Sequence, residues 1–212
     1  MTGNGFTSAN VCGIFNAGHE EALASGLDNF TPSKAAMAIG RDLALLPYWG
    51  MECDAVVVPN VEEYVGFLSS LPLSGRGKTL VASLGEARGA AVEPWGWDRA
   101  VACAARKAGL AVGVGLDGMD MLSRLQNRRF SSDFLNRLLP RLRSCEKLAG
   151  LRFAGESHFA TDEQQAEKIM GKLGKCVLKR PVSGSGRGIL IAENGMGKRE
   201  RDWCRASCRR GG

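Results

Sequence analysis

A lysine-bearing apolar run enters a glycine-rich loop late in the sequence, and this combination is typical of phosphate binding. The segment reads VLKRPVSGSGRGILIAE over residues 177–193, so the loop joins two β-like runs. Glycines adopt positive φ and let backbone N–H groups point at an anion without a Cβ in the way. Lys179 adds a point charge from the entering strand. The predicted phosphate ligands of the loop are Ser183, Gly184, Ser185, Gly186, Arg187 and Gly188.

The spelling of this loop excludes two common phosphate motifs. The sequence contains no GxxxxGK[ST], and the glycines of this loop, at 184, 186 and 188, run G-x-G-x-G rather than G-x-G-x-x-G. The alternation of a strand places Val177, Lys179 and Pro181 on one face, with Leu178 and Arg180 on the other. The alternative interpretation is a flexible hairpin tip without a ligand. A lysine beside an apolar Cys-Val-Leu run favours the phosphate site.

The elements before this loop alternate between short apolar runs and helical patterns, which predicts an α/β fold with a parallel sheet. Strands are expected at 11–15, 55–59 and 79–84. Thr31 is expected to cap a helix that has Pro32 at its first position and stops at Pro47. Further helices are expected at 61–71, 97–109, 119–128 and 131–143. The fold class is therefore a Rossmann-like α/β domain.

Polar residues follow the first expected strand, at the edge where ligands of open parallel sheets bind. The possible substrate loop comprises Asn16, Gly18, His19 and Glu20. His19 next to carboxylates could act as a general base, and a hydrogen-bonded loop histidine is the alternative.

The pattern changes after about residue 145. Thr161 is expected to cap a helix, with Gln164 at the spacing of a capping box, and Gly174 is expected to end it. Two β runs joined by the glycine-rich loop follow, and then a helix over 198–210. We therefore expect one domain over 1–150 and a small α+β unit over 151–212, a helix plus a β-hairpin.

Several motifs resemble those of ATP-grasp proteins, in particular a group from Bacteroidetes-type bacteria with a Rossmann-like pre-ATP-grasp domain. The hairpin at 177–188 is similar to the small ATP-grasp subdomain. The other similar stretches are FNAGHEEALA at 15–24, FTP at 30–32 with RDLALLP at 41–47, and PWGW at 94–97. Ala17 stands where the group is expected to have proline.

The resemblance implies an ATP-dependent ligase that activates a carboxylate as an acyl phosphate for attack by an amine or thiol. Lys179 would neutralise the α- and β-phosphates, and the backbone of 183–188 would cover the β/γ end. The implied cofactors are ATP and Mg²⁺. The Mg²⁺ ligands would belong to a larger subdomain that residues 189–212 cannot accommodate, so the ATP-grasp part is expected to be truncated. Such a chain would bind ATP weakly and be catalytically incomplete.

Composition places the chain among globular proteins of a reducing compartment. It has 212 residues, 44% hydrophobic and 24% charged, without the apolar run that a membrane span needs. Seven scattered cysteines without a CxxC favour free thiols and a cytoplasmic location, and no membrane partner is expected. Cys12 is expected to be buried and inert. The expected partners are ATP, a carboxylate substrate and an amine or thiol substrate. A homo-oligomer is a further possibility that the sequence does not decide.

The net charge of +6 comes from two basic segments. Residues 124–143 include six arginines and a single acidic residue, an aspartate. Six basic residues lie between 196 and 212. A solvated helix face is the favoured interpretation, so nucleic acid is disfavoured as a partner. A non-catalytic module that binds nucleic acid or a partner protein through these segments is the alternative function.

Overall fold

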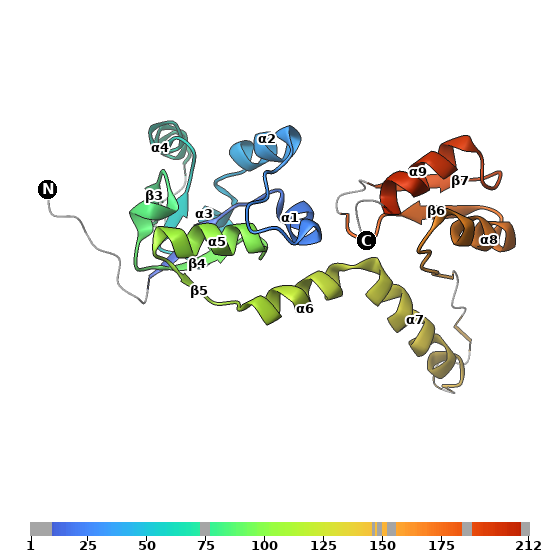
Figure 1. The fold of residues 1–212 in the computed structure, drawn as a ribbon. Coiled ribbons are helices and arrows are strands. Elements are labelled where there is room, and N and C mark those ends of the chain that lie inside the picture. Colours follow the sequence, from blue (N-terminus) through green and yellow to red (C-terminus); the bar gives the residue numbers. More distant parts are fainter. Residues whose placement is uncertain are drawn as a thin grey trace, which may run out of the picture. The chain divides into compact units, whose positions relative to one another are not determined.

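The computed structural model describes residues 10–72, 77–145, 147, 150–151, 156–183 and 188–208 (Figure 1). The chain divides into two compact units, Met1–Asp120 and Met121–Gly212, and each is considered by itself. This division falls within α6 (Leu116–Gln126). The domain boundary expected near residue 150 stays a prediction.

The first unit is built on a five-stranded parallel sheet, which confirms the α/β class. Its order is β3-β2-β1-β4-β5. The strands are β1 (Val11–Ile14), β2 (Ala55–Val57), β3 (Thr79–Val81), β4 (Ala91–Pro94) and β5 (Ala111–Val112). The register pairs Cys12 with Ala55 on one side and with Val92 on the other. The first three strands match the expected runs, whereas β4 and β5 had no counterpart among the expected strands.

Both faces of this sheet are buried, as a parallel sheet requires. Adjacent residues of β2 serve opposite faces, because side chains alternate along a strand. Ala55 belongs to a cluster that includes residues of α5 (Arg99–Ala108) and of the 3₁₀ helix η1 (Leu84–Ala87). Val56 belongs to a second cluster with residues of α3 (Leu46–Gly50) and α4 (Val61–Ser70). The side chains of Ala55 and Val56 are fully buried.

The helix expected between Thr31 and Pro47 is wrong in its boundaries. The structure has two helices there, α2 (Lys34–Asp42) and α3, and the cap of α2 is Ser33, whose Oγ accepts from the backbone of Ala36 at 3.3 Å. Pro47 lies in the first turn of α3 rather than after a helix, a position where the missing N–H costs nothing. The helix α1 (His19–Ser25) precedes this pair.

The second unit contains α7 (Arg128–Arg143), α8 (Glu163–Leu173), an antiparallel hairpin of β6 (Cys176–Lys179) and β7 (Ile189–Ala192), and α9 (Lys198–Cys208) (Figure 1). The expected helix and hairpin are thus confirmed. The capping of α8 is shifted by one residue from the expected Thr161 and Gln164. Asp162 Oδ1 accepts from the backbone of Gln165 at 2.8 Å, and Gln165 Oε1 accepts from the Thr161 N–H at 2.8 Å.

Helices α8 and α9 are joined by ion pairs and by a small apolar core. Arg201 donates to Glu167 at 2.7 Å, and Arg205 donates to Glu163. Both helices and β7 contribute buried side chains, namely Ala166, Met170, Leu190, Ala192 and Cys204. No helix in the described part of the chain is long and apolar enough to cross a membrane.

Candidate functional site

The β6–β7 hairpin presents one covered face and one open face. Leu190 and Ala192 are buried, whereas Val177, Ile189 and Ile191 are 50%, 40% and 56% exposed. Lys179 is the last residue of β6, is exposed and pairs in register with Ile189. The expected alternation is therefore observed, and Lys179 stands at the end of an exposed aliphatic face. Among the described residues, no acidic group forms an ion pair with Lys179.

The base of the glycine-rich loop is closed by a backbone hydrogen bond, and position 188 favours glycine. The Arg180 N–H donates to the Gly188 carbonyl at 2.8 Å, and Gly188 has φ of +64°. A Cβ at position 188 would lie 2.7 Å from Cδ in the side chain of Arg180. The positive φ and this close approach both make a larger residue unfavourable there. The expected ligands Gly184, Ser185, Gly186 and Arg187 lie outside the described residues.

Arg128, the first residue of α7, fixes the entry to this loop. Its Nε donates to the Arg180 carbonyl at 3.0 Å, and its Nη2 donates to the Ser183 carbonyl at 2.7 Å. The Arg128 backbone N–H donates to the Pro181 carbonyl at 2.8 Å. The planar fork of a guanidinium suits two carbonyls at once. The expected solvated helix face is wrong for Arg128, because its side chain is half-buried and bonded to the loop carbonyls.

Ser183 keeps a hydroxyl proton that could be donated to a ligand. Its Oγ accepts from Arg128 Nη2 at 3.2 Å. A hydroxyl that accepts one bond still has its proton to donate. Lys179 and Ser183 are thus two of the predicted phosphate ligands that the structure describes, with the hydroxyl held beside a guanidinium.

The edge of the parallel sheet offers a second candidate, between the carboxyl ends of β1 and β4. The strand order reverses between these two strands, and ligands of open α/β sheets bind at such a point. Asn16 Nδ2 donates to the Gly96 carbonyl at 2.6 Å and to Asp98 Oδ2 at 2.9 Å, while its Oδ1 accepts from the Gly96 N–H at 3.1 Å. Asn16 therefore links the two strand ends, and both its amide nitrogen and its amide oxygen are engaged in these bonds.

His19 lies directly over Gly96. A Cβ at position 96 would be 2.1 Å from Cδ2 of His19, so the ring occupies the space that a side chain would fill. His19 Nδ1 donates to the Asn16 carbonyl at 3.1 Å, because a carbonyl can only accept. In the neutral ring this leaves Nε2 as an acceptor. The structure thus brings His19 and Asn16 together, as predicted, and adds Gly96.

Asp98 is a component of this edge that the sequence analysis did not single out. It is 3% exposed and caps α5 through a 2.8 Å bond from the Val101 N–H. Burial raises the pKa of Asp98 above its ordinary value, and the bonds from Val101 and Asn16 and the charge of His19 oppose that rise. The signal that could have found it is an aspartate, a favoured N-cap residue, at the start of the helix expected at 97–109, which begins at Arg99 in the structure.

The two remaining predicted residues of the loop have different environments. Gly18 is buried, and a Cβ there would lie 3.1 Å from Cβ of Pro32, so its role is close packing. Glu20 is half-buried in the first turn of α1, where a negative charge is favourable. Trp95 nearby is exposed and contacts Phe15 edge to face, with ring centroids 5.3 Å apart.

Comparison with known proteins gives no match: no family model fits the chain, and no curated protein or solved structure is significantly similar to it. The functional proposal therefore depends on the geometry of the two sites above.

Proposed function

We propose that this chain binds the phosphates of ATP at the Lys179 hairpin, as part of an ATP-grasp-type protein that activates a carboxylate. The single observation that carries the proposal is the exposed ammonium of Lys179 at the end of β6, beside a loop base held by Arg128. A parallel-sheet unit that precedes such a hairpin supports the same family. Lys179 supplies charge, and Ser183 supplies a hydroxyl donor.

The open face of the hairpin supports a nucleotide rather than a simple anion. Val177, Ile189 and Ile191 are exposed around Lys179, and aliphatic side chains suit the flat face of a base. In this proposal the apolar face receives adenine, and the lysine faces the phosphates. Positioning and charge stabilisation are what phosphoryl transfer requires of a protein.

The proposed reaction has two steps. A carboxylate oxygen attacks the γ-phosphorus, the bond to the β-phosphate oxygen breaks, and ADP and an acyl phosphate form. An amine or thiol then attacks the acyl carbon, and inorganic phosphate leaves with the bonding electrons. We assign the sheet edge at Asn16 and His19 to binding one of these substrates, where Nε2 of the neutral His19 can accept a hydrogen bond.

The residues near the hairpin do not fit a Mg²⁺ site. Glu193, which follows β7, forms an ion pair with Lys175 at 2.6 Å. The described part of the chain contains no group of three or more histidine, cysteine, aspartate or glutamate side chains that could hold a metal. We therefore derive no step through Mg²⁺ in this chain.

The alternative, a binding module for nucleic acid or a partner protein, has fewer available cations than the sequence suggests. Arg128 binds loop carbonyls, and Arg201 and Arg205 pair with glutamates of α8. If the alternative holds, binding of an RNA or DNA duplex weakens steeply as salt rises, because counterions are released. A gel-shift titration at several salt concentrations measures this dependence.

The test of the proposed function is a calorimetric titration of the whole chain with ATP, AMP and adenosine. ATP should bind more tightly than AMP, and Lys179→Ala should weaken ATP binding about tenfold by removing a charge-assisted contact. Adenosine binding should not change. Lys198→Ala, an exposed lysine on α9, is the matched control and should leave ATP affinity unchanged. Equal binding of ATP by the wild type and Lys179→Ala, or no binding at all, would refute the proposal.

A further inference from the structure

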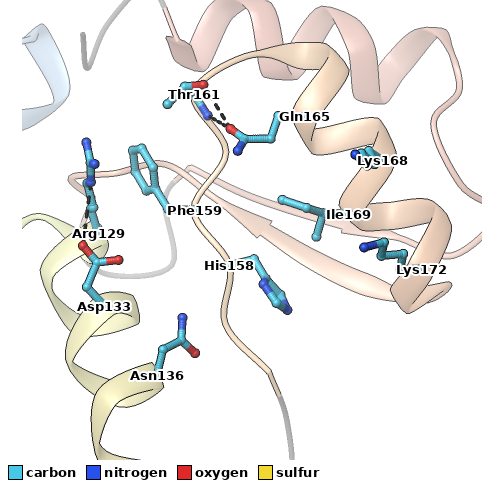
Figure 2. Close-up of a pocket in the computed structure, with 10 residues that line it drawn as sticks. All are labelled: Arg129, Asp133, Asn136, His158, Phe159, Thr161, Gln165, Lys168, Ile169 and Lys172. Carbon is cyan, nitrogen blue, oxygen red and sulfur yellow. Dashed lines mark hydrogen bonds and ion pairs between the residues drawn. The ribbon is translucent and has the colours of Figure 1, made fainter.

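A pocket of about 520 Å³ lies within the second unit, between α7, α8 and the segment that connects them (Figure 2). This volume is in the range of small-molecule sites. Its lining residues are Arg129, Asp133 and Asn136 from α7, His158, Phe159 and Thr161 from the segment, and Gln165, Lys168, Ile169 and Lys172 from α8. We infer that this pocket binds a small organic anion, a carboxylate or phosphate attached to a flat apolar body.

The charge of the pocket is the first reason. Lys168 and Lys172 are exposed at i and i+4 on one face of α8, a spacing at which like charges destabilise a helix. In the described part of the chain, neither lysine has an ion-pair partner. Asp133 is the carboxylate of the lining, and it lies 3.8 Å from Arg129, which offsets its charge. Two ammonium groups therefore remain to attract an anion.

The uncharged part of the lining specifies an anion that carries an apolar group. Phe159 and Ile169 are half-buried and supply apolar side chains to the lining, and Figure 2 shows Ile169 and Lys172 reaching from α8 toward the segment. Gln165 uses its Oε1 to accept from Thr161, so its NH₂ group is left to donate. The lysines, the amide donor and these two apolar side chains together complement a carboxylate or phosphate attached to a ring.

This pocket is distinct from the proposed ATP site. Successive residues at the start of α7 serve the two sites: Arg128 binds the loop carbonyls, and Arg129 lines the pocket with its guanidinium 5.2 Å from the Phe159 ring centre. None of the predicted loop ligands is among the lining residues. The inference therefore goes beyond ATP binding and does not depend on it.

The test is an NMR titration of the ¹⁵N-labelled whole chain with phenyl phosphate and with benzoate as separate probes. Ligands of this size bind with a Kd of about 1 mM. Both probes should shift amides at 129–136, 158–161 and 165–172 in a saturable way, and the tighter one identifies phosphate or carboxylate as the preferred group. Lys168→Gln/Lys172→Gln should weaken binding roughly fivefold to tenfold, since two exposed ion pairs are lost.

Two controls separate anion recognition from non-specific attraction. Lys107→Gln/Lys198→Gln removes the same charge away from the pocket and should leave the Kd unchanged. Benzyl alcohol, which has the ring without the charge, should not shift these amides at the same concentrations. Equal weakening by both double variants, equal shifts from benzyl alcohol, or shifts confined to other amides would overturn the inference, as would the absence of saturable shifts.

Discussion

Replacing Arg128 tests whether the glycine-rich loop is held by the start of α7. Arg128→Met keeps most of the side-chain volume and removes three hydrogen bonds, two to loop carbonyls and one to Ser183 Oγ, at 3.0, 2.7 and 3.2 Å. The backbone bond from residue 128 to the Pro181 carbonyl stays. These three bonds of a half-exposed cation contribute about 2 kcal/mol to the free energy that keeps the loop base closed. The value is below the sum of three charge-assisted bonds, because water replaces them when the loop base opens.

The assay is amide hydrogen exchange of Arg180, whose N–H is bonded to the Gly188 carbonyl. A loss of about 2 kcal/mol in the free energy of local opening corresponds to about thirtyfold faster exchange. Arg128→Lys keeps the charge but not the fork, so it should accelerate exchange by roughly fivefold. Arg129→Met is the control, because Arg129 contacts Asp133 and Phe159 rather than the loop. Unchanged exchange in Arg128→Met, or equal acceleration in Arg129→Met, refutes the role of Arg128.

Three further predictions concern the first unit. Gly96→Ala places a methyl group 2.1 Å from the present position of Cδ2 in His19, so the ring must move, and urea denaturation should show a loss of about 1–3 kcal/mol. Burial raises the pKa of Asp98 above 3.8, so the folded state holds this proton more tightly than the unfolded state. The stability of the wild type relative to Asp98→Asn should therefore fall as pH rises from about 3.8 through the folded pKa, as denaturation at several pH values measures. Burial raises the pKa of Cys12 to about 12 from 9.0, which lowers its thiolate fraction about a thousandfold at neutral pH. Mass spectrometry after iodoacetamide treatment should find the exposed Cys208 alkylated and Cys12 unmodified until the chain unfolds.

Each of these predictions has a control or a contradicting outcome. Gly66→Ala, in α4, meets no atom within 4 Å and should stabilise the helix by up to about 1 kcal/mol. Equal destabilisation by Gly96→Ala and Gly66→Ala would contradict the packing of His19 over Gly96. If the difference in the free energy of unfolding between the wild type and Asp98→Asn stayed constant with pH, the raised pKa of Asp98 would be contradicted. Alkylation of Cys12 at the rate of Cys208 in the folded chain would contradict its burial.

Local sequence patterns were sufficient to predict strand β2, the end of helix α5 and the alternation along β6, because neighbouring residues determine these features. Residues 55–59 are predominantly β-branched, and β2 forms among them because such side chains suit a sheet buried on both faces. Gly109 ends α5 with φ of +82°, a conformation that glycine adopts without a steric penalty. The alternation around Lys179 predicted which side chains of β6 share a face, because side chains along a strand have a period of two.

Element ends that depend on competing caps could not be read from the sequence alone. Ser33 rather than Thr31, and Asp162 rather than Thr161, caps the helix that follows. In both places two capping residues lie within three positions, so residue type does not distinguish them. Strand β4 was missed because Ala-Val-Glu-Pro has no strand pattern of its own, and its pairing with β1 supplies the hydrogen bonds.

The contacts that define both candidate sites were decided only by the tertiary structure. Asn16 meets Gly96 and Asp98 across about 80 positions of sequence, because β1 and β4 are neighbours in the sheet. Arg128 reaches Ser183 across 55 positions, because α7 begins beside the hairpin. The sequence by itself singled out Lys179, Ser183 and His19 as candidates from residue type and local setting. It could not identify the side chains that hold those residues in place, because sequence separation carries no information about which strand ends and helix starts lie together.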